Sequence, residues 1–280
     1  MKTASTKTKS LITNRIPILC RYFGKSRGLI VALLLHVFSF DNTCKASDTV
    51  LPGWDLFQTV SPTDFGGVSF LGVPIVSYDF GSGAQNVGNT DTIVHRLDSA
   101  SAPSTAIPTE MVALQLQSSV PVDFGLGLGI YYITLQSARG GPASSGRMTI
   151  NFDPAGEVIP HGTFDSFFDI FFDIRLGALS GPIALSDDLL LTSQGTPWVH
   201  DPPPGAVLID GINHNVNGND QANDFWPVAS IGNPLTETHP TGARHSVVPA
   251  TAPDAGSTAL TLAIGLFGLG MLRRKCRLLA

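Results

Sequence analysis

Between residues 48 and 234 the chain alternates short apolar runs with turn-forming residues. The runs are rich in Val, Ile, Phe and Tyr; Gly, Pro, Asn and Asp separate them at nearly regular intervals, and a long helical period is almost absent. This pattern is typical of strands joined by tight turns. We expect strands over residues 68–80, 111–116, 130–135, 148–152 and 206–209. The predicted fold is therefore mainly β, a single antiparallel β-sandwich or jelly roll and not a doubly wound sheet.

The segment 162–176 fits both a helical and a strand period. In a helix, Asp165, Asp169 and Asp173 would lie four residues apart and the phenylalanines would form one stripe. In a strand, one face is apolar and the other holds the three aspartates and Arg175. We favour the strand, because Phe and Ile prefer strands and Asp is poor inside a helix. We interpret the aspartates as a solvated face that Arg175 balances in part; a row that binds a cation or a substrate is the alternative.

Asp-Phe-Gly occurs three times, at residues 64–66, 79–81 and 123–125. The region from 47 to 254 has no lysine, which excludes a kinase lysine, a phosphate-binding P-loop and a Schiff base there. We therefore interpret the three copies as turns between strands.

The first 46 residues have the layout of a secretory signal. Seven basic residues and no acid precede Asp41, and an apolar run over 28–40 follows the basic region. Cys44 and Ala46 are small residues at the minus three and minus one positions, so we predict cleavage after Ala46. An uncleaved N-terminal anchor is the alternative.

The last thirty residues combine a short polar motif, an apolar span and a basic cluster. Residues 255–272 carry no charge and are just long enough for a transmembrane helix. Because basic residues stay on the cytoplasmic side, the cluster places the C-terminus inside and the preceding chain outside. The cluster consists of Arg273, Arg274, Lys275 and Arg277.

The motif Pro253-Asp254-Ala255-Gly256, ahead of this span and cluster, resembles that of the PEP-CTERM sorting domains. It is closest to the variant that reads Val-Pro-Asp-Ser-Gly; Ala252 and Ala255 stand in place of its Val and Ser. The resemblance covers residues 251–280. It implies recognition by an exosortase, a membrane-embedded transpeptidase that transfers the protein to the envelope or outside the cell, in Gram-negative bacteria that make exopolysaccharide. A single-pass anchor that is never cleaved is the alternative.

These features set the expected domain boundaries. They are a signal peptide over 1–46, one β domain over 47–232, a linker over 233–250 and the sorting tail over 251–280, with its motif at 252–258, its span at 255–272 and its basic cluster at 273–277. The linker is predicted because the composition turns to Pro, Thr, His and Ala. His239 and His245 lie in it, and we expect both to be solvated.

The expected exported part is strongly acidic and lacks cysteine. From Ser47 to Asp254 there are 21 acidic residues and five arginines, a formal charge of 5 − 21 = −16. Such a surface argues against nucleic acid and anionic lipid as partners and is compatible with divalent cations. Without cysteine the domain must fold without disulfides, so its stability has to come from a buried core.

One loop resembles a calcium-binding loop. Between residues 213 and 224, oxygen-bearing side chains alternate around a bend at Gly218, as hard cations require. The candidate ligands are Asn213, Asn215, Asn217, Asn219 and Asp224. Because Asp224 is the only carboxylate among them, the predicted affinity is weak, in the millimolar class. The alternative is an Asx-rich turn whose side chains bond their own backbone. No other cofactor is predicted.

Aromatic and histidine side chains supply the remaining candidates. The tryptophans at 54, 198 and 226 sit in loop-like settings, where they would either stack on sugar rings or be buried. His161, His200 and His214 are candidates for a metal or base site, but their spacing is equally compatible with loop or core histidines. No Gly-x-Ser-x-Gly elbow, His-Glu-x-x-His site or exported Cys nucleophile occurs.

These observations predict a sorted, exported and non-enzymatic envelope or matrix protein that binds polysaccharide. Its expected partners are the secretion machinery, the exosortase, the inner membrane and exopolysaccharide. The alternatives are a carbohydrate-active hydrolase that uses paired aspartates and a purely structural surface protein.

Overall fold

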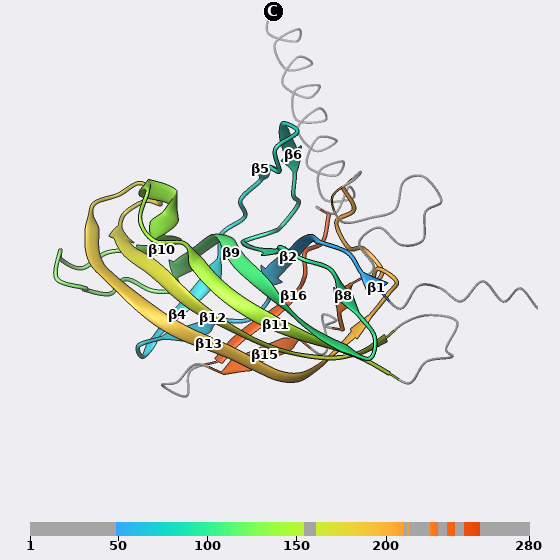
Figure 1. Ribbon diagram of the computed structural model, residues 1–280. Helices are drawn as coiled ribbons and strands as arrows, with labels where there is room; N and C mark the ends of the chain where they lie inside the picture. Colours follow the sequence, from blue (N-terminus) through green and yellow to red (C-terminus); the bar gives the residue numbers. More distant parts are fainter. Residues whose placement is uncertain are drawn as a thin grey trace, which may run out of the picture. The chain divides into compact units, whose positions relative to one another are not determined.

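The computed structural model describes residues 49–153, 161–209, 212, 225–228, 234–238 and 244–252, and all regular structure in this part of the chain is β apart from one short 3-10 helix, η1 (Gln136–Arg139). The strands, shown in Figure 1, are β1 (Thr49–Val50), β2 (Gly53–Thr59), β3 (Thr63–Phe65), β4 (Val68–Gly72), β5 (Ser77–Asp79), β6 (Ala84–Asn86), β7 (Thr92–Arg96), β8 (Ala100–Ser101), β9 (Ser104–Ser118), β10 (Tyr131–Leu135), β11 (Ser144–Phe152), β12 (His161–Leu176), β13 (Ile183–Val199), β14 (Trp226–Pro227), β15 (Leu235–Thr238) and β16 (Arg244–Pro249). The mainly β prediction is confirmed.

Twelve of these strands form one continuous antiparallel sheet. Its order is β10-β12-β11-β9-β7-β2-β16-β15-β13-β14, with β4 attached to β9 and β3 to β4. Because β13 also pairs with β12, the series from β9 through β7, β2, β16, β15, β13, β12 and β11 returns to β9. The hydrogen bonding of the described strands thus closes the main sheet on itself, which differs from the two separate sheets expected for a sandwich. The pairs β1–β8 and β5–β6 form two small additional sheets.

Strands β10 and β11 occupy the same position between β9 and β12. β11 pairs with the first half of β9 and β10 with its last residues, and both pair with β12 in the same order. They are therefore one strand interrupted by an excursion over residues 136–143, which contains η1. At the end of the excursion, the Ser144 hydroxyl accepts a hydrogen bond from the Phe171 N–H of β12 at 3.0 Å. A side chain thus replaces the backbone partner that this N–H would otherwise have in the neighbouring strand.

The long strand predicted over 162–176 is present as β12, and the apolar face predicted for it is confirmed. Phe164, Phe168 and Ile170 are buried in the core, whereas Asp165 and Asp169 are exposed. The prediction of a solvated face is wrong at Asp173, which is fully buried. Its burial is possible because two guanidinium groups and a hydroxyl bind it, as described below.

The largest core lies between the inward faces of the closed sheet. It combines Phe57 of β2, Met111 of β9, Phe168 of β12 and Val247 of β16 with their neighbours. A second, smaller core formed by Leu56, Val87, Val207, Ile209 and Ala250 covers the other face of β2. Successive residues of β2 therefore pack into different cores, because neighbouring side chains of a strand point to opposite faces of the sheet.

The predicted linker over 233–250 is wrong for its described residues. β15 and β16 lie within it and pair with each other, and β16 also pairs with β2. His245, expected to be solvated, is only 3% exposed. The polar composition of the segment is misleading because His245, a polar residue, is buried with a hydrogen bond to Thr59.

The strands expected over 111–116, 130–135 and 148–152 are confirmed within β9, β10 and β11, and the segment 68–80 divides into β4 and β5. The strand expected over 206–209 is wrong, because these residues contain only an isolated bridge between Ala206 and Thr251. The three Asp-Phe-Gly turns are confirmed. Asp64, Asp79 and Asp123 each accept a hydrogen bond from the N–H of a following glycine at 2.7 to 2.8 Å.

No helix within the described residues is long and apolar enough to cross a membrane. The predicted signal peptide over 1–46 and the predicted transmembrane helix over 255–272 lie outside the residues that the structure describes.

Candidate functional site

A cluster of aromatic side chains is built on the face of β2 that bears the smaller core. The register pairs Trp54 of β2 with His95 of β7, and their rings stack with centroids 3.7 Å apart and planes 1° apart. Both side chains are half-buried. The pairing of β2 with β7 thus holds the Trp54 and His95 rings face to face on the outside of the closed sheet.

The β5–β6 hairpin adds two further rings. Phe80 lies edge-on to Trp54 at 5.1 Å between centroids, and Tyr78 lies 4.9 Å from Phe80. Asp79, between them, accepts hydrogen bonds from the N–H groups of Gly81 and Gly83, both of which have positive φ. This turn folds the hairpin back, so that Tyr78 of β5 and Phe80 of the turn lie next to Trp54. In Figure 1 the hairpin extends beyond the edge of the main sheet.

Glu110 supplies a carboxylate to the same region. The register of β9 with β7 places Glu110 directly opposite His95. Burial raises the pKa of Tyr78, and the negative charges of Glu110 and Asp79 raise it further, so the phenol keeps its proton. Burial, followed by the positive charge of Arg96, lowers the pKa of His95, so this imidazole is neutral at pH 7. We call these five residues the aromatic cluster: Trp54, Tyr78, Phe80, His95 and Glu110.

The aromatic cluster combines the groups that sugars require. Aromatic faces and edges pack against the C–H faces of sugar rings, and a carboxylate and a phenol bind hydroxyl groups. Trp54, Tyr78 and Phe80 also pack against the smaller core, so they stabilise this face of β2 as well. Sequence reasoning singled out Trp54 but not its neighbours, because Tyr78, His95 and Glu110 come from three other strands.

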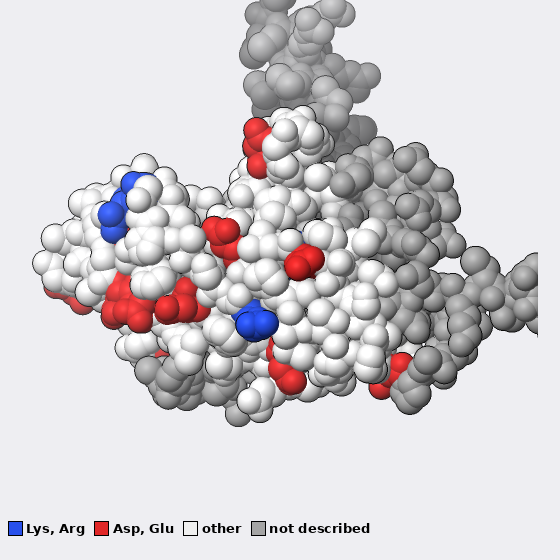
Figure 2. All heavy atoms as spheres, in the orientation of Figure 1, with Lys and Arg blue, Asp and Glu red and all other residues white. Residues whose placement is uncertain are grey.

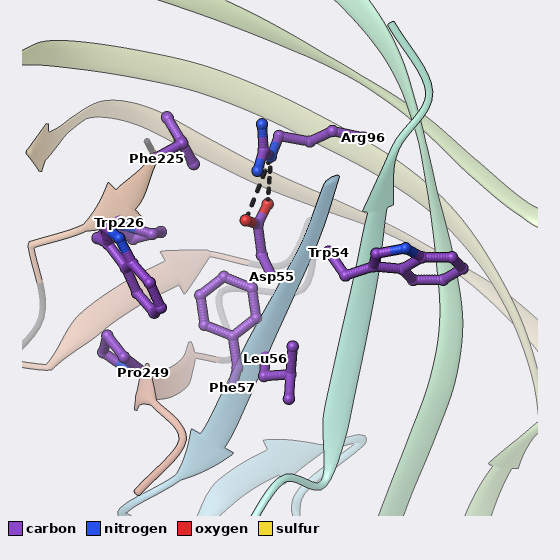
Figure 3. A pocket seen from close by; sticks show the side chains of 9 residues that line it. Trp54, Asp55, Leu56, Phe57, Arg96, Phe225, Trp226 and Pro249 are labelled. Carbon is purple, nitrogen blue, oxygen red and sulfur yellow. Dashed lines mark hydrogen bonds and ion pairs between the residues drawn. The ribbon is translucent and has the colours of Figure 1, made fainter. Parts of the chain in front are cut away.

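The other two tryptophans are not available for stacking on a ligand. Trp198 is 1% exposed and donates its indole N–H to the Asn151 carbonyl at 3.1 Å; Trp226 is 7% exposed. Both belong to strands, as does Trp54, so the expectation of loop settings is wrong for all three. In Figure 3, Trp226 lies on the inner side of β2 with Phe57, whereas Trp54 points the other way.

Asp55 and Arg96 form an ion pair inside the sheet. The Arg96 Nε lies 3.1 Å from Asp55 Oδ2, and the two side chains are 1% and 4% exposed for Arg96 and Asp55 respectively (Figure 3). Arg96 also donates to the Leu51 carbonyl and lies 5.1 Å above the Phe225 ring. Burial raises the pKa of Asp55 more than the Arg96 charge and hydrogen bond lower it. With its charge paired and water excluded, this pair has a structural role.

A second buried polar group surrounds Asp91. Its carboxylate accepts the Thr59 N–H at 2.7 Å and the hydroxyls of Thr59 and Thr92 at 3.0 and 2.8 Å. The Thr59 hydroxyl oxygen lies 3.1 Å from His245 Nε2. The Thr59 hydroxyl lies between the Asp91 carboxylate and the His245 imidazole. In a catalytic triad the histidine lies between the nucleophile and the carboxylate, so the order differs here. All of these side chains are buried. The group therefore joins β2 to β16.

The three aspartates of β12 have separate environments. Asp173 accepts hydrogen bonds from Arg139, Arg175 and Ser186. Asp165 accepts the Gly195 N–H of β13 at 2.7 Å, and Asp169 is exposed. Asp173 is therefore not available to a row with Asp165 and Asp169 that would bind a cation or a substrate.

The predicted metal candidates are not brought together in the described residues. His161 lies 3.1 Å from Asp153, and His200 lies 3.0 Å from the adjacent Asp201. No group of three or more potential ligands is found in the part of the chain that the structure describes. His214 and the candidate calcium ligands Asn213, Asn215, Asn217, Asn219 and Asp224 lie outside it, so the calcium loop stays a prediction.

Comparison with known proteins assigns the tail. A family model described as the VPDSG-CTERM motif matches residues 253–276. The chain carries a VPDSG-CTERM sorting tail. The match contains the predicted motif residues Pro253, Asp254, Ala255 and Gly256 and most of the basic cluster. No curated protein and no solved structure is significantly similar to the chain.

The VPDSG-CTERM tail supports an exported, envelope-associated protein. The surface of the described domain agrees with the acidic composition. Carboxylates are spread over the face in Figure 2, whereas basic side chains appear in few places.

Proposed function

We propose that the chain is a non-enzymatic component of the cell envelope or extracellular matrix and that its β domain binds polysaccharide at the aromatic cluster. The observation that carries this proposal is the stacked pair of Trp54 and His95 with Glu110 opposite His95, on the outside of an exported domain. Aromatic rings beside a carboxylate bind neutral or amino sugars better than acidic ones, because Glu110 and the acidic surface repel anions.

The VPDSG-CTERM tail supplies the delivery step. We infer that an exosortase in the inner membrane recognises the motif at 253–256 and that the apolar span and the basic cluster hold the chain during this step. Cleavage near the motif would remove Arg273, Arg274, Lys275 and Arg277. Intact-mass measurement of protein recovered outside the cell tests this, because a mass that includes the basic cluster would contradict processing.

Binding to extracted exopolysaccharide tests the role of the aromatic cluster. Glu110→Gln keeps size and hydrogen bonding but removes the charge, and Tyr78→Phe removes only the phenol hydroxyl. Both should weaken co-sedimentation with the polymer several-fold, whereas Asp169→Asn, a like change on β12, should not. Equal binding by all four proteins would overturn the assignment of the site.

The same experiment separates the binding protein from a hydrolase. A binding protein retains the polymer without releasing reducing ends. Release of reducing ends that is lost when one aspartate is neutralised would favour the hydrolase instead. If the protein neither binds nor degrades the polymer, the result would favour a purely structural surface protein.

A further inference from the structure

A cavity lies at one end of the sheet. It has a volume of about 180 Å³ and lies between β3, the turn at Phe124, the end of β12 and the start of β13. Its apolar lining comprises Phe65, Phe124, Phe172, Ile174, Leu185 and Leu189. An apolar cavity of about 150 Å³ can hold benzene, so this one is large enough for a phenyl ring or a short alkyl chain.

Three carboxylates line the same cavity. They belong to Asp64, Asp187 and Asp188, all of which are exposed, and no basic residue is among the lining residues. Asp64 uses one oxygen to accept the Gly67 N–H at 2.7 Å, and Asp187 uses one to accept the Asp188 N–H at 2.9 Å. In Figure 2 a prominent group of carboxylates lies over the strands β12 and β13.

The nearby arginines do not neutralise this end of the sheet. Arg139 and Arg175 both bind Asp173, whose carboxylate also accepts the Ser186 hydroxyl. Because the two guanidinium groups share one carboxylate, this group carries one net positive charge against the three carboxylates that line the cavity, and this end of the sheet remains acidic.

Leu185 is the most exposed residue of the apolar lining, whereas Phe65, Phe172 and Ile174 are buried. It lines the cavity and is 41% exposed, although it carries an aliphatic side chain on a β-strand. An apolar body placed against Leu185 and Phe172 would be removed from water there, while its polar end stayed among the aspartates.

We propose that this cavity binds a small amphiphilic amine, with its aryl or alkyl body among the phenylalanines and its ammonium group beside Asp187 and Asp188. Apolar enclosure supplies affinity, and charge complementarity selects a cation over a neutral or anionic ligand of the same shape. This binding site is separate from the aromatic cluster and does not depend on the proposed binding of polysaccharide.

Three probes of one shape test the selection by charge. Benzylamine, benzyl alcohol and benzoate are titrated by saturation-transfer NMR into the full-length chain in lipid nanodiscs, with empty nanodiscs subtracted. Benzylamine should bind about fivefold more tightly than benzyl alcohol, because a solvent-exposed ion pair contributes at most about a fivefold gain in affinity. Benzoate should bind least. Equal binding of amine and alcohol, or no binding of the amine, would overturn the proposal.

Two variants locate the site. Asp187→Asn combined with Asp188→Asn should reduce benzylamine to the affinity of benzyl alcohol and leave the alcohol unchanged. Leu189→Phe fills the cavity and should weaken both. Circular dichroism melts establish that each variant is folded. If a folded double variant keeps the full preference for the amine, the amine binds elsewhere and the assignment is wrong.

Discussion

Arg139 Nε lies 2.6 Å from Asp173 Oδ2, which ties the excursion between β10 and β11 to the neighbouring strand β12. Asp173 is fully buried and also accepts Arg175 at 2.8 Å and Ser186 at 2.6 Å. Burial alone would raise the pKa of Asp173, but the hydrogen bonds and charges of these partners outweigh it and leave the pKa below its ordinary value of 3.8. The interrupted strand is thus held by a charged contact that a continuous strand would not need.

Asp173→Asn should lower the free energy of unfolding by about 2 kcal/mol, because a charged acceptor is lost from several hydrogen bonds. Since the folded-state pKa is depressed, the contribution of Asp173 is present above pH 3.8 and is lost as the pH falls through the folded-state value. Urea unfolding should therefore show a constant difference from wild type near neutral pH that shrinks in acid. Asp169→Asn, on the same strand but exposed, is the control; a loss as large there would contradict this account.

The opposite dependence on pH is expected at Asp91. Burial raises its pKa above 3.8 despite hydrogen bonds from Thr59 and Thr92 and the charge of His245. A raised folded-state pKa favours folding below pH 3.8, and this contribution is lost as the pH rises through the folded-state value. The stability of wild type relative to Asp91→Asn should thus decrease as the pH rises from about 4 through the raised folded-state pKa. A pH-independent difference between the two proteins would show that Asp91 titrates normally.

Sequence periodicity predicted β12 well because its information is local. Alternation alone places Phe164 and Phe168 in the core. It does not predict the burial of Asp173, because Arg139, which pairs with its charge, lies 34 residues away in the sequence. The alternation of apolar and polar residues gives no sign of the excursion that carries Arg139. The linker prediction over 233–250 is wrong at β16 for the same reason. Burial of His245 depends on Thr59, which is 186 residues distant along the chain.

The candidate site shows the same limit. Trp54 was recognisable as an aromatic residue of interest, but its stacking on His95 depends on the register of β2 with β7. The opposition of His95 and Glu110 depends on the register of β7 with β9, which contains a shift between Ile93 and Val94. Registers of strands distant in sequence are set by packing, so composition and spacing do not reveal them. The sorting tail, in contrast, is a contiguous motif and was predicted from sequence.

The buried Asp55–Arg96 pair yields a double-mutant test. Arg96→Met leaves the Asp55 carboxylate buried without its cation and should cost about 3 kcal/mol or more of unfolding free energy. Replacing both residues, with Asp55→Leu added, should cost less than Arg96→Met alone, because no uncompensated charge remains. Denaturant unfolding of the two single variants and the double variant measures this. A double variant that loses the sum of the single effects would show that the two side chains do not interact.

Calcium binding by the loop over 213–224 is tested by thermal unfolding of the full-length protein in EDTA and then in calcium at several millimolar. If the loop binds calcium, an ion concentration of 100 times the dissociation constant stabilises the folded state by about 2.7 kcal/mol, which should raise the melting temperature by several degrees. Asp224→Ala removes the only predicted carboxylate ligand and should abolish the shift, whereas Asp169→Asn on β12 should keep it. An equal shift in wild type and Asp224→Ala would place calcium elsewhere, and no shift in wild type would reduce the loop to an Asx-rich turn.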